Sequence, residues 1–359
     1  ASSVAENASA LTLTATLSVA TTADVTVTLT GSGTSTAGTD YASLSTITIS
    51  AGSTTGTTAF TPTDDATYEG SETAVIAITG VSGGSATENG TQSQTITLTD
   101  NETAPTVTLT SSASSVAENG SNLTLTATLS VKTNADVTVT LTGGGTSTAG
   151  TDYASLSTIT ISAGSTTGTT AFTPTDDATY EGSETAVIAI TGVSGGSATE
   201  NGTQSQTITL TDNETAPTVT LTSSASSVAE NASALTLTAT LSGKTYENVT
   251  VNVSSLGADS TVSSSSDYSV SSTITITGGN TVGTGSFTPT DDSSNPVYEE
   301  TEAVTVSLSS ITGGSASLSG SVSQTISITE NESVPTLSLS GTASIDEKTE
   351  STAITACLL

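Results

Sequence analysis

The sequence has almost no positive charge, no histidine and few aromatic residues. Its 359 residues include three basic and 34 acidic side chains, for a formal net charge of -31 at pH 7. The basic residues are Lys132, Lys244 and Lys348. So acidic a chain repels phosphate backbones and anionic lipid headgroups, which argues against nucleic acid or a membrane surface as a partner. Cations are the partners that this charge favours.

The same absences argue against an enzyme and against disulfide stabilisation. Without histidine, a serine or cysteine nucleophile has no general base, and the chain has no aromatic-rich cleft for a glycosidase-like carboxylate pair. Cys357 is the only cysteine, so no disulfide can form within the chain. No apolar run approaches the roughly 20 residues that cross a bilayer. We therefore expect a non-catalytic protein that does not insert into a membrane.

The chain is an internal repeat. Residues 1–112 recur at 113–224 with five differences, and a looser third copy follows. A period of about 112 residues is close to the size of an independent domain, so each copy should contain its own core. The chain begins and ends inside a repeat, which indicates a segment of a longer array. The expected units are residues 1–102, 103–214 and 215–332, with 333–359 as the start of a fourth unit or an exchanged tail strand.

Apolar and polar residues alternate through each copy with a period of two. Leu11, Leu13, Ala15 and Leu17 are separated by threonines, which is typical of a half-buried strand. Similar segments predict strands at 11–17, 25–29, 44–50, 55–61, 73–79, 93–99 and 105–110. Seven short strands in about a hundred residues predict an all-β fold, in which tandem seven-stranded antiparallel sandwiches of immunoglobulin-like architecture form a linear array.

The acidic residues concentrate at one end of the predicted sandwich. If successive strands alternate in direction, eight of the ten acidic residues in the first copy reach the end where the next copy is joined. Carboxylates so crowded repel one another unless a cation lies among them, and the chain supplies almost no basic side chain. Ca²⁺ suits such an all-oxygen site better than zinc or copper. A solvated acidic cap that only keeps the chain soluble is the alternative.

Four motifs carry a resemblance to a known family. Ser3-Val-Ala-Glu-Asn7, Ala37-Gly-Thr-Asp-Tyr41, Asp64-Asp-Ala-Thr-Tyr-Glu-Gly-Ser-Glu72 and Thr99-Asp-Asn-Glu102 recur in order in the copies. In this order and spacing they resemble the Calx-beta domain. The resemblance implies a seven-stranded sandwich with Ca²⁺ at the pole between domains.

The resemblance also implies the ligands in each copy. In the first they are Glu6, Asp40, Asp64, Asp65, Glu69, Glu72 and Asp100. In the second they are Glu118, Asp152, Asp176, Asp177, Glu181, Glu184 and Asp212. In the third they are Glu230, Asp267, Asp291, Asp292, Glu299, Glu302 and Glu330. The third copy departs from the pattern because residues 293–296 are inserted and Glu330 replaces an aspartate.

These observations favour an extracellular calcium-binding structural protein: a stalk or filament of a cell-surface adhesin or matrix fibre, stiffened by Ca²⁺. Two other functions stay open, namely a glycan- or surface-binding adhesin module and a calcium-sensing domain of a membrane protein. Copies of the chain could also join head to tail, if the segment after Pro335 completes the first sandwich of another molecule by strand addition.

Overall fold

The computed structural model consists of β-strands and connecting loops. It describes residues 2–257, 266–292 and 298–340, together with the backbone of 355–358. By internal contacts these residues form two compact units, one of Ala1–Thr175 with Glu184–Leu210 and one of Asp176–Ser183 with Thr211–Leu359. Among the described residues, no helix has the length and apolar character needed to cross a membrane.

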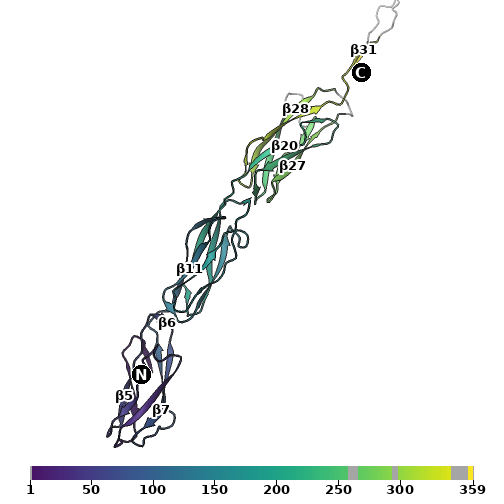
Figure 1. Ribbon diagram of the computed structural model, residues 1–359. Coiled ribbons are helices and arrows are strands. Elements are labelled where there is room, and N and C mark those ends of the chain that lie inside the picture. Colours follow the sequence, from purple (N-terminus) through teal and green to yellow (C-terminus); the bar gives the residue numbers. More distant parts are fainter. Residues whose placement is uncertain (1, 258–265, 293–297, 341–354, 359) are drawn as a thin grey trace, which may run out of the picture. The chain divides into compact units, whose positions relative to one another are not determined.

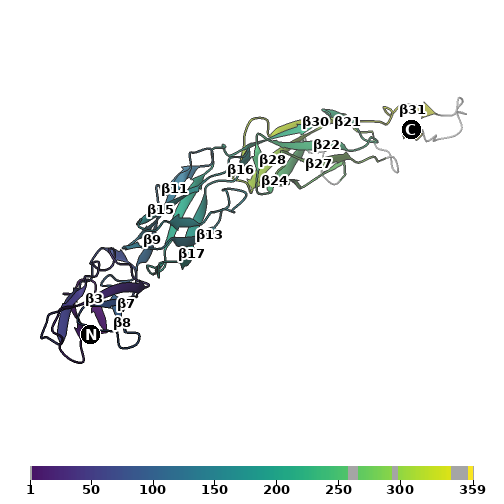
Figure 2. The same cartoon turned by 60° about the horizontal axis from the view of Figure 1, so that its bottom comes forward.

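Repeat 1 (residues 1–102) forms two sheets. Its main strands are β1 (Ser3–Ala5), β2 (Leu11–Thr16), β3 (Val25–Gly33), β4 (Ile47–Ile49), β5 (Thr55–Phe60), β7 (Glu72–Ser82) and β8 (Ser93–Thr99). The larger sheet has the order β1-β8-β7-β3-β4, and the smaller contains β2 and β5. Figure 1 labels β5 and β7 of this repeat, and Figure 2 labels β3, β7 and β8.

Repeat 2 (residues 103–214) has the same larger sheet, but its smaller sheet has four strands. Its strands are β9 (Thr106–Ser111), β10 (Ser115–Ala117), β11 (Leu123–Leu129), β13 (Val137–Gly145), β14 (Ile159–Ile161), β15 (Thr167–Phe172), β17 (Glu184–Ser194), β18 (Thr199–Glu200) and β19 (Ser205–Thr211). The sheet orders are β10-β19-β17-β13-β14 and β15-β11-β9-β18.

Repeat 3 (residues 215–332) has the same two sheets, with one additional strand in the smaller sheet. Its strands are β20 (Thr218–Ser223), β21 (Ser227–Ala229), β22 (Leu235–Leu241), β24 (Val249–Gly257), β25 (Tyr268–Val270), β26 (Thr273–Ile276), β27 (Val282–Pro289), β28 (Glu302–Thr312), β29 (Ser317–Leu318) and β30 (Ser323–Thr329). The orders are β21-β30-β28-β24-β26 and β25-β27-β22-β20-β29. The predicted all-β fold of tandem immunoglobulin-like sandwiches is confirmed.

Each core lies between the two sheets and contains one stacked aromatic pair. In repeat 1, Tyr41 and Phe60 are buried with ring centroids 4.8 Å apart. A methyl group on Gly31 would lie 2.0 Å from the Tyr41 hydroxyl, so this glycine leaves room for the ring. The repeats use the same packing, with centroid distances of 4.9 and 5.1 Å in repeats 2 and 3.

The prediction of purely antiparallel pairing was incomplete. After β9, the chain crosses to the other sheet, where β10 lies beside β19. The equivalent β1 pairs in parallel with β8 in repeat 1, as β21 does with β30 in repeat 3. These three-residue strands contain a single valine each and give no alternation long enough to detect in the sequence.

Short strands also join the acidic loops of repeats 1 and 2 to residues of the repeat that follows. In one compact unit, β6 (Thr67–Tyr68) pairs in parallel with β12 (Lys132–Thr133). In the other, β16 (Thr179–Tyr180) pairs in the same way with β23 (Lys244–Thr245), and the Tyr246 N–H donates to the Tyr180 carbonyl at 3.1 Å. The last described strands, β31 (Leu337–Ser340) and β32 (Thr355–Leu358), form a hairpin.

Candidate cation site

Two strand pairings bring the first acidic residues of repeat 1 together. The parallel register of β1 and β8 places Ala5 opposite Thr99, so that Glu6 and Asp100 leave the same end of the sheet. The Glu6 N–H continues this pairing by donating to the Thr99 carbonyl at 3.1 Å. Distant parts of the sequence therefore meet because β1 joins the edge of the larger sheet.

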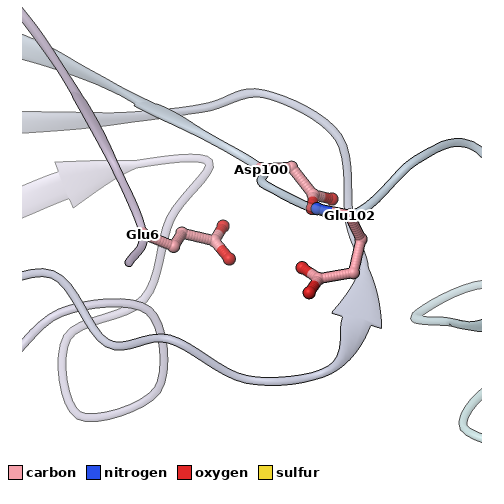
Figure 3. Close-up of side chains that lie close together, drawn as sticks. All are labelled: Glu6, Asp100 and Glu102. Atoms are coloured by element: carbon pink, nitrogen blue, oxygen red, sulfur yellow. The ribbon is translucent and has the colours of Figure 1, made fainter. Parts of the chain in front are cut away.

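Glu6, Asp100 and Glu102 form the first acidic cluster. One carboxylate oxygen of each lies within 4.8 Å of the other two, and Figure 3 shows the Glu6 and Glu102 carboxylates pointing toward each other. Only 4% of Glu6 is exposed, and its Oε1 atom is buried without a hydrogen-bond partner. A buried carboxylate oxygen without a donor is costly, and a bound cation would satisfy it.

Asp100 holds the acidic loop in place through its backbone. Its Oδ2 atom accepts from the N–H groups of Glu69 and Gly70 at 2.6 and 2.8 Å. Its Oδ1 atom accepts from the Glu102 N–H at 2.8 Å, which turns the chain so that Glu102 returns to the cluster. Gly70 has φ of 76°, a conformation that glycine adopts readily.

Asp40, Glu69 and Glu72 form a second cluster with the same spacing, again with one oxygen of each within 4.8 Å of the others. Asp40 is buried next to the core residue Tyr41, and its Oδ2 accepts from the Thr36 N–H at 2.5 Å. Glu72 begins β7 and lies opposite Leu98 of β8, which is two residues before Asp100. The two clusters are thus fixed by the same sheet and loop.

Burial and mutual repulsion disfavour the charged forms of these side chains. Burial, followed by the charges of Asp100, Glu69, Asp65 and Glu102, raises the pKa of Glu6 to about 7. Burial and then Asp40 raise the pKa of Glu72 to about 7 as well. For ionised Glu6 and Asp100 at most 4.8 Å apart, the repulsion is on the order of 3 kcal/mol at an effective dielectric constant of about 20. A cation would offset this repulsion.

Asp64 and Asp65 lie on the exposed part of the loop. The Thr67 N–H donates to Asp65 Oδ1 at 2.6 Å, directly before the residues of β6. Their charges nevertheless reach the clusters. Burial and nearer groups raise the pKa of Glu6 and of Glu102 most, and Asp65 adds to the rise for Glu6 as Asp64 does for Glu102. Both residues therefore border the site and add to its negative potential.

Repeat 3 builds the first cluster with different partners. Glu230 is 6% exposed and lies with Glu330 and Glu332, one oxygen of each within 4.8 Å of the others. Burial, then the charges of neighbouring acidic residues with Glu330 foremost, raise the pKa of Glu230 to about 7. Burial tends to raise the pKa of Glu330 too, but hydrogen bonds, first from the Glu332 backbone, hold it below its usual value. A side-chain hydrogen bond with Glu330, followed by burial and the charge of Glu330, raises the pKa of Glu332 to about 7.

The loop of repeat 3 is held less extensively than that of repeat 1. Glu330 Oε2 accepts from the Glu299 N–H, as Asp100 does from Glu69. Glu300 occupies the position of Gly70 but is not among the non-glycine residues with positive φ. Asp267 and Glu302 are buried, whereas the predicted effect of the insertion at 293–296 lies outside the described residues. Asp291 and Asp292 come directly before that gap.

The predicted ligands of repeat 2 are divided between the two compact units. In one unit, Glu118 and Asp152 are buried, Glu184 begins β17, and Asp152 Oδ2 accepts from the Thr148 N–H at 2.5 Å. In the other, Asp212 Oδ2 accepts from the N–H groups of Glu181 and Gly182 at 2.6 and 2.7 Å. Asp177 accepts from Thr179 at 2.6 Å beside the exposed Asp176, so the local loop geometry repeats that of repeat 1.

The sequence reasoning left three glutamates out of the ligand set. Glu102 and Glu332 each complete a three-carboxylate cluster, and Glu214 has the same position in repeat 2, where its N–H donates to Asp212 Oδ1 at 2.8 Å. The spacing in Asp100-Asn-Glu102 could have indicated Glu102. An aspartate carboxylate readily accepts a hydrogen bond from the backbone N–H two residues later, and this bond turns the chain back toward the aspartate. The atoms that these side chains could offer to a metal ion are all carboxylate oxygens, which fit Ca²⁺ or Mg²⁺.

Tandem immunoglobulin-like sandwiches that carry clusters of partly buried carboxylates form a class of modules suited to binding hard cations. The family model of the Calx-beta domain matches residues 1–102, 100–214 and 212–333. The chain belongs to the Calx-beta family, as the four motifs indicated. No curated protein matches the chain.

Several solved structures are similar in fold. The calcium-binding domain pair CBD12 from CALX1.2 is 14% identical, with 62% of this chain and 99% of that chain covered and a TM-score of 0.29. The apo form of the Calx CBD1 domain is 18% identical over 32% of this chain and 98% of its own, with a TM-score of 0.27. A tetra-tandem repeat from the extending region of a large adhesion protein is 16% identical, with 94% of this chain and 76% of that chain covered and a TM-score of 0.38.

Proposed function

We propose that this chain is an extracellular structural repeat protein whose acidic poles bind Ca²⁺ and thereby hold successive repeats in fixed orientations. Its role is that of a stalk or filament in a cell-surface adhesin or matrix fibre, and no catalytic step is assigned to it. The proposed partners are calcium ions, the neighbouring repeats and a second copy of the chain. Membership of the Calx-beta family and the buried, all-oxygen clusters support calcium as the ion.

One observation carries the structural role: the acidic loop is also the segment that pairs with the next repeat. Thr67 and Tyr68 form β6 between Asp65 and Glu69, and they pair with Lys132 and Thr133. The same pairing joins β16 to β23 in the other unit. Because the loop residues on both sides of the pair belong to the proposed site, an ion that orders the loop also orders its pairing with the next repeat.

The proposed ligands of repeat 1 fall into two groups. Glu6, Asp100 and Glu102 would hold one cation, and Asp40, Glu69 and Glu72 a second, while Asp64 and Asp65 add negative potential beside them. When bound, Ca²⁺ supplies the positive charge that the protein lacks. Asp100 acts as a positioning residue as well, because its carboxylate accepts from three backbone N–H groups.

The placement of the few lysines supports the same function. Lys132 stands opposite Thr67 in β12, and Lys244 stands opposite Thr179 in β23. Each therefore brings a positive charge to the strand pair that borders the acidic loop of the preceding repeat. A lone surface lysine neutralises only a small part of the charge of several carboxylates, so a divalent cation is still required.

Isothermal titration calorimetry and hydrogen exchange of the full chain test this function together. We expect saturable binding of Ca²⁺ that is tighter than that of Mg²⁺, and slower amide exchange at 64–72 and 131–134 when Ca²⁺ is added. The variant Glu69→Gln should weaken both effects, whereas Glu88→Gln, an acid outside the clusters, should change neither. Binding without any change in exchange would refute the structural role, and absence of binding at millimolar Ca²⁺ would refute the calcium site.

A further inference from the structure

A small cavity lies where the acidic loop of repeat 2 meets repeat 3, inside one of the two compact units. Its volume is about 140 Å³, whereas pockets for drug-sized ligands span roughly 300–1,000 Å³. A space of this size suits a single side chain or another small group. The cavity is lined by Tyr180, Glu181, Tyr246, Glu247, Gly314 and Ser315.

Two tyrosines and two carboxylates define the chemistry of this cavity. Tyr246 is 71% exposed, so much of its ring is uncovered. Glu247 is exposed too, and its Oε2 atom accepts from the Gly314 N–H at 3.2 Å, which holds the carboxylate at the cavity wall. Carboxylates and aromatic faces both attract cations, and none of the six lining residues is basic. The cavity therefore favours a positively charged group.

The tyrosine and the carboxylate that repeat 3 contributes have no counterpart in repeat 2. Counting from the lysine of each short strand, the two positions hold Asn134 and Ala135 in repeat 2. The place where repeat 1 meets repeat 2 therefore differs from the cavity in two of the six lining positions. The other four positions carry the same residue types there, namely Tyr68, Glu69, Gly196 and Ser197.

The two extra side chains are not needed for the strand pairing beside them. β12 pairs with β6 in the same parallel way as β23 pairs with β16, although asparagine and alanine follow β12. The next residue also holds the neighbouring turn alike in both repeats. Asp136 Oδ1 accepts from the Ala163 N–H at 2.8 Å. In repeat 3, Asn248 Oδ1 accepts from the Gly278 N–H at 2.9 Å.

Repeat 3 also carries a backbone change that accompanies Tyr246. Gly278 stands where repeat 2 has Ala163. A Cβ atom on Gly278 would lie 2.1 Å from the Tyr246 carbonyl oxygen, so the backbone of the tyrosine passes too close for a side chain at that position. The placement of Tyr246 at the cavity therefore depends on a glycine that repeat 2 lacks.

An arginine side chain meets these requirements better than a lysine side chain. Its planar guanidinium group stacks on aromatic faces, donates to carboxylates in pairs and is more weakly hydrated than an ammonium group. The three repeats contain no arginine, so none of them can supply the occupant. The net charge of -31 attracts a basic partner over a distance.

We propose that this cavity binds the guanidinium group of an arginine side chain from a partner protein. Tyr246 stacks on the plane of the guanidinium, and the Glu247 carboxylate accepts from its N–H groups. Tyr180 and Glu181 complete the lining on the side of the acidic loop. Among the lining residues, Glu181 alone is also a proposed calcium ligand, so binding of the arginine does not require the ion.

Nuclear magnetic resonance titration of the full chain in chelator, with Nα-acetylarginine amide as the probe, tests this proposal apart from the calcium function. We expect saturable shifts of the amide resonances of residues 180–181, 246–247 and 314–315. Nα-acetyllysine amide should bind several-fold more weakly, and the uncharged isostere Nα-acetylcitrulline amide should not bind. If the lysine or the citrulline compound binds as tightly as the arginine compound, the proposal is overturned.

A double variant removes the two side chains that distinguish the cavity. Tyr246→Asn/Glu247→Ala introduces the residue types of repeat 2 and should weaken binding of the arginine probe roughly tenfold or more. Glu88→Ala changes the net charge by the same amount in repeat 1 and should leave the affinity unchanged. An equal loss in both variants would reduce the binding to general charge attraction and contradict the proposal.

The reverse substitutions test whether these residues suffice. Asn134→Tyr/Ala135→Glu/Ala163→Gly gives repeat 2 the residue types of repeat 3 and the glycine that accompanies them. This variant should bind a second equivalent of the arginine probe, with new shifts at residues 68–69, 134–135 and 196–197. A variant that folds with unchanged shifts elsewhere and still binds one equivalent would refute the assignment of binding to the tyrosine and glutamate.

Discussion

Repeats 1 and 3 bury the same glutamate, Glu6 or Glu230, but surround it with different partners. In repeat 1, the short Asp100 side chain accepts from the backbone of Glu69 and Gly70. In repeat 3, the longer Glu330 replaces the aspartate, and Glu300 replaces the glycine. The three-carboxylate cluster survives both changes. The sheet therefore suffices to form the cluster. The hydrogen bonds to the acidic loop are fewer in repeat 3, where Glu330 has one methylene group more than Asp100 and Glu300 replaces Gly70.

The largest effect is expected from removing the buried carboxylate of one repeat at a time. Glu6→Gln should abolish the contribution of the cluster of Glu6, Asp100 and Glu102 to the Ca²⁺-dependent stabilisation of repeat 1, about 2.7 kcal/mol at a hundredfold excess of Ca²⁺ over Kd, and leave the contributions of the other clusters. Glu230→Gln should do the same for its own cluster in repeat 3. Calorimetric thermal unfolding with and without Ca²⁺ measures both. Glu88→Gln serves as the control, and loss of both contributions in either variant would contradict independent sites.

A smaller effect is expected from exchanging the partners between the repeats. Glu300→Gly/Glu330→Asp should strengthen Ca²⁺ binding by repeat 3 about fivefold, on the order of 1 kcal/mol, because the loop regains a hydrogen bond to a carboxylate. Asp100→Glu should weaken binding by repeat 1 to a similar extent. Titration calorimetry of each chain decides the matter, and unchanged affinities would show that the backbone bonds to Asp100 do not matter for the ion.

A further expected effect is a pH dependence that both repeats share in the absence of metal. The pKa of Glu6 and of Glu230 rises from 4.5 to about 7 on folding. Between these values the folded chain binds more protons than the unfolded chain, so the free energy of unfolding should fall as pH rises from about 4.5 to about 7. Thermal unfolding in chelator measures this slope, which Glu6→Gln should reduce. With Ca²⁺ present the slope should reverse, because the ion competes with protons.

Much of the fold could be predicted because threonine alternates with aliphatic residues in the long strands. Leu11 to Leu17 and Val25 to Leu29 report the core face directly, and the seven expected strands match the long strands of repeat 2. The short strands could not be predicted. Ser3–Ala5 and Thr67–Tyr68 depend on neighbours far away in the sequence and carry no periodicity.

The acidic pole could be predicted in outline and not in detail. Alternating strand directions bring Glu6 and Asp100 to one end whatever the exact pairing. The division into two clusters could not be predicted, because it depends on the parallel register of β1 and β8 and on the turn at Asp100. Glu102 enters the first cluster through that turn, which is a property of backbone hydrogen bonds.

The central claim is that bound calcium neutralises buried carboxylates and stabilises the folded repeats. The most direct measurement is the melting temperature of the full chain near neutral pH in millimolar Ca²⁺ and in chelator. A stabilisation of about 2.7 kcal/mol per site should raise the melting temperature by roughly 10 °C or more for repeats of this size. Equal melting temperatures under the two conditions would contradict the account.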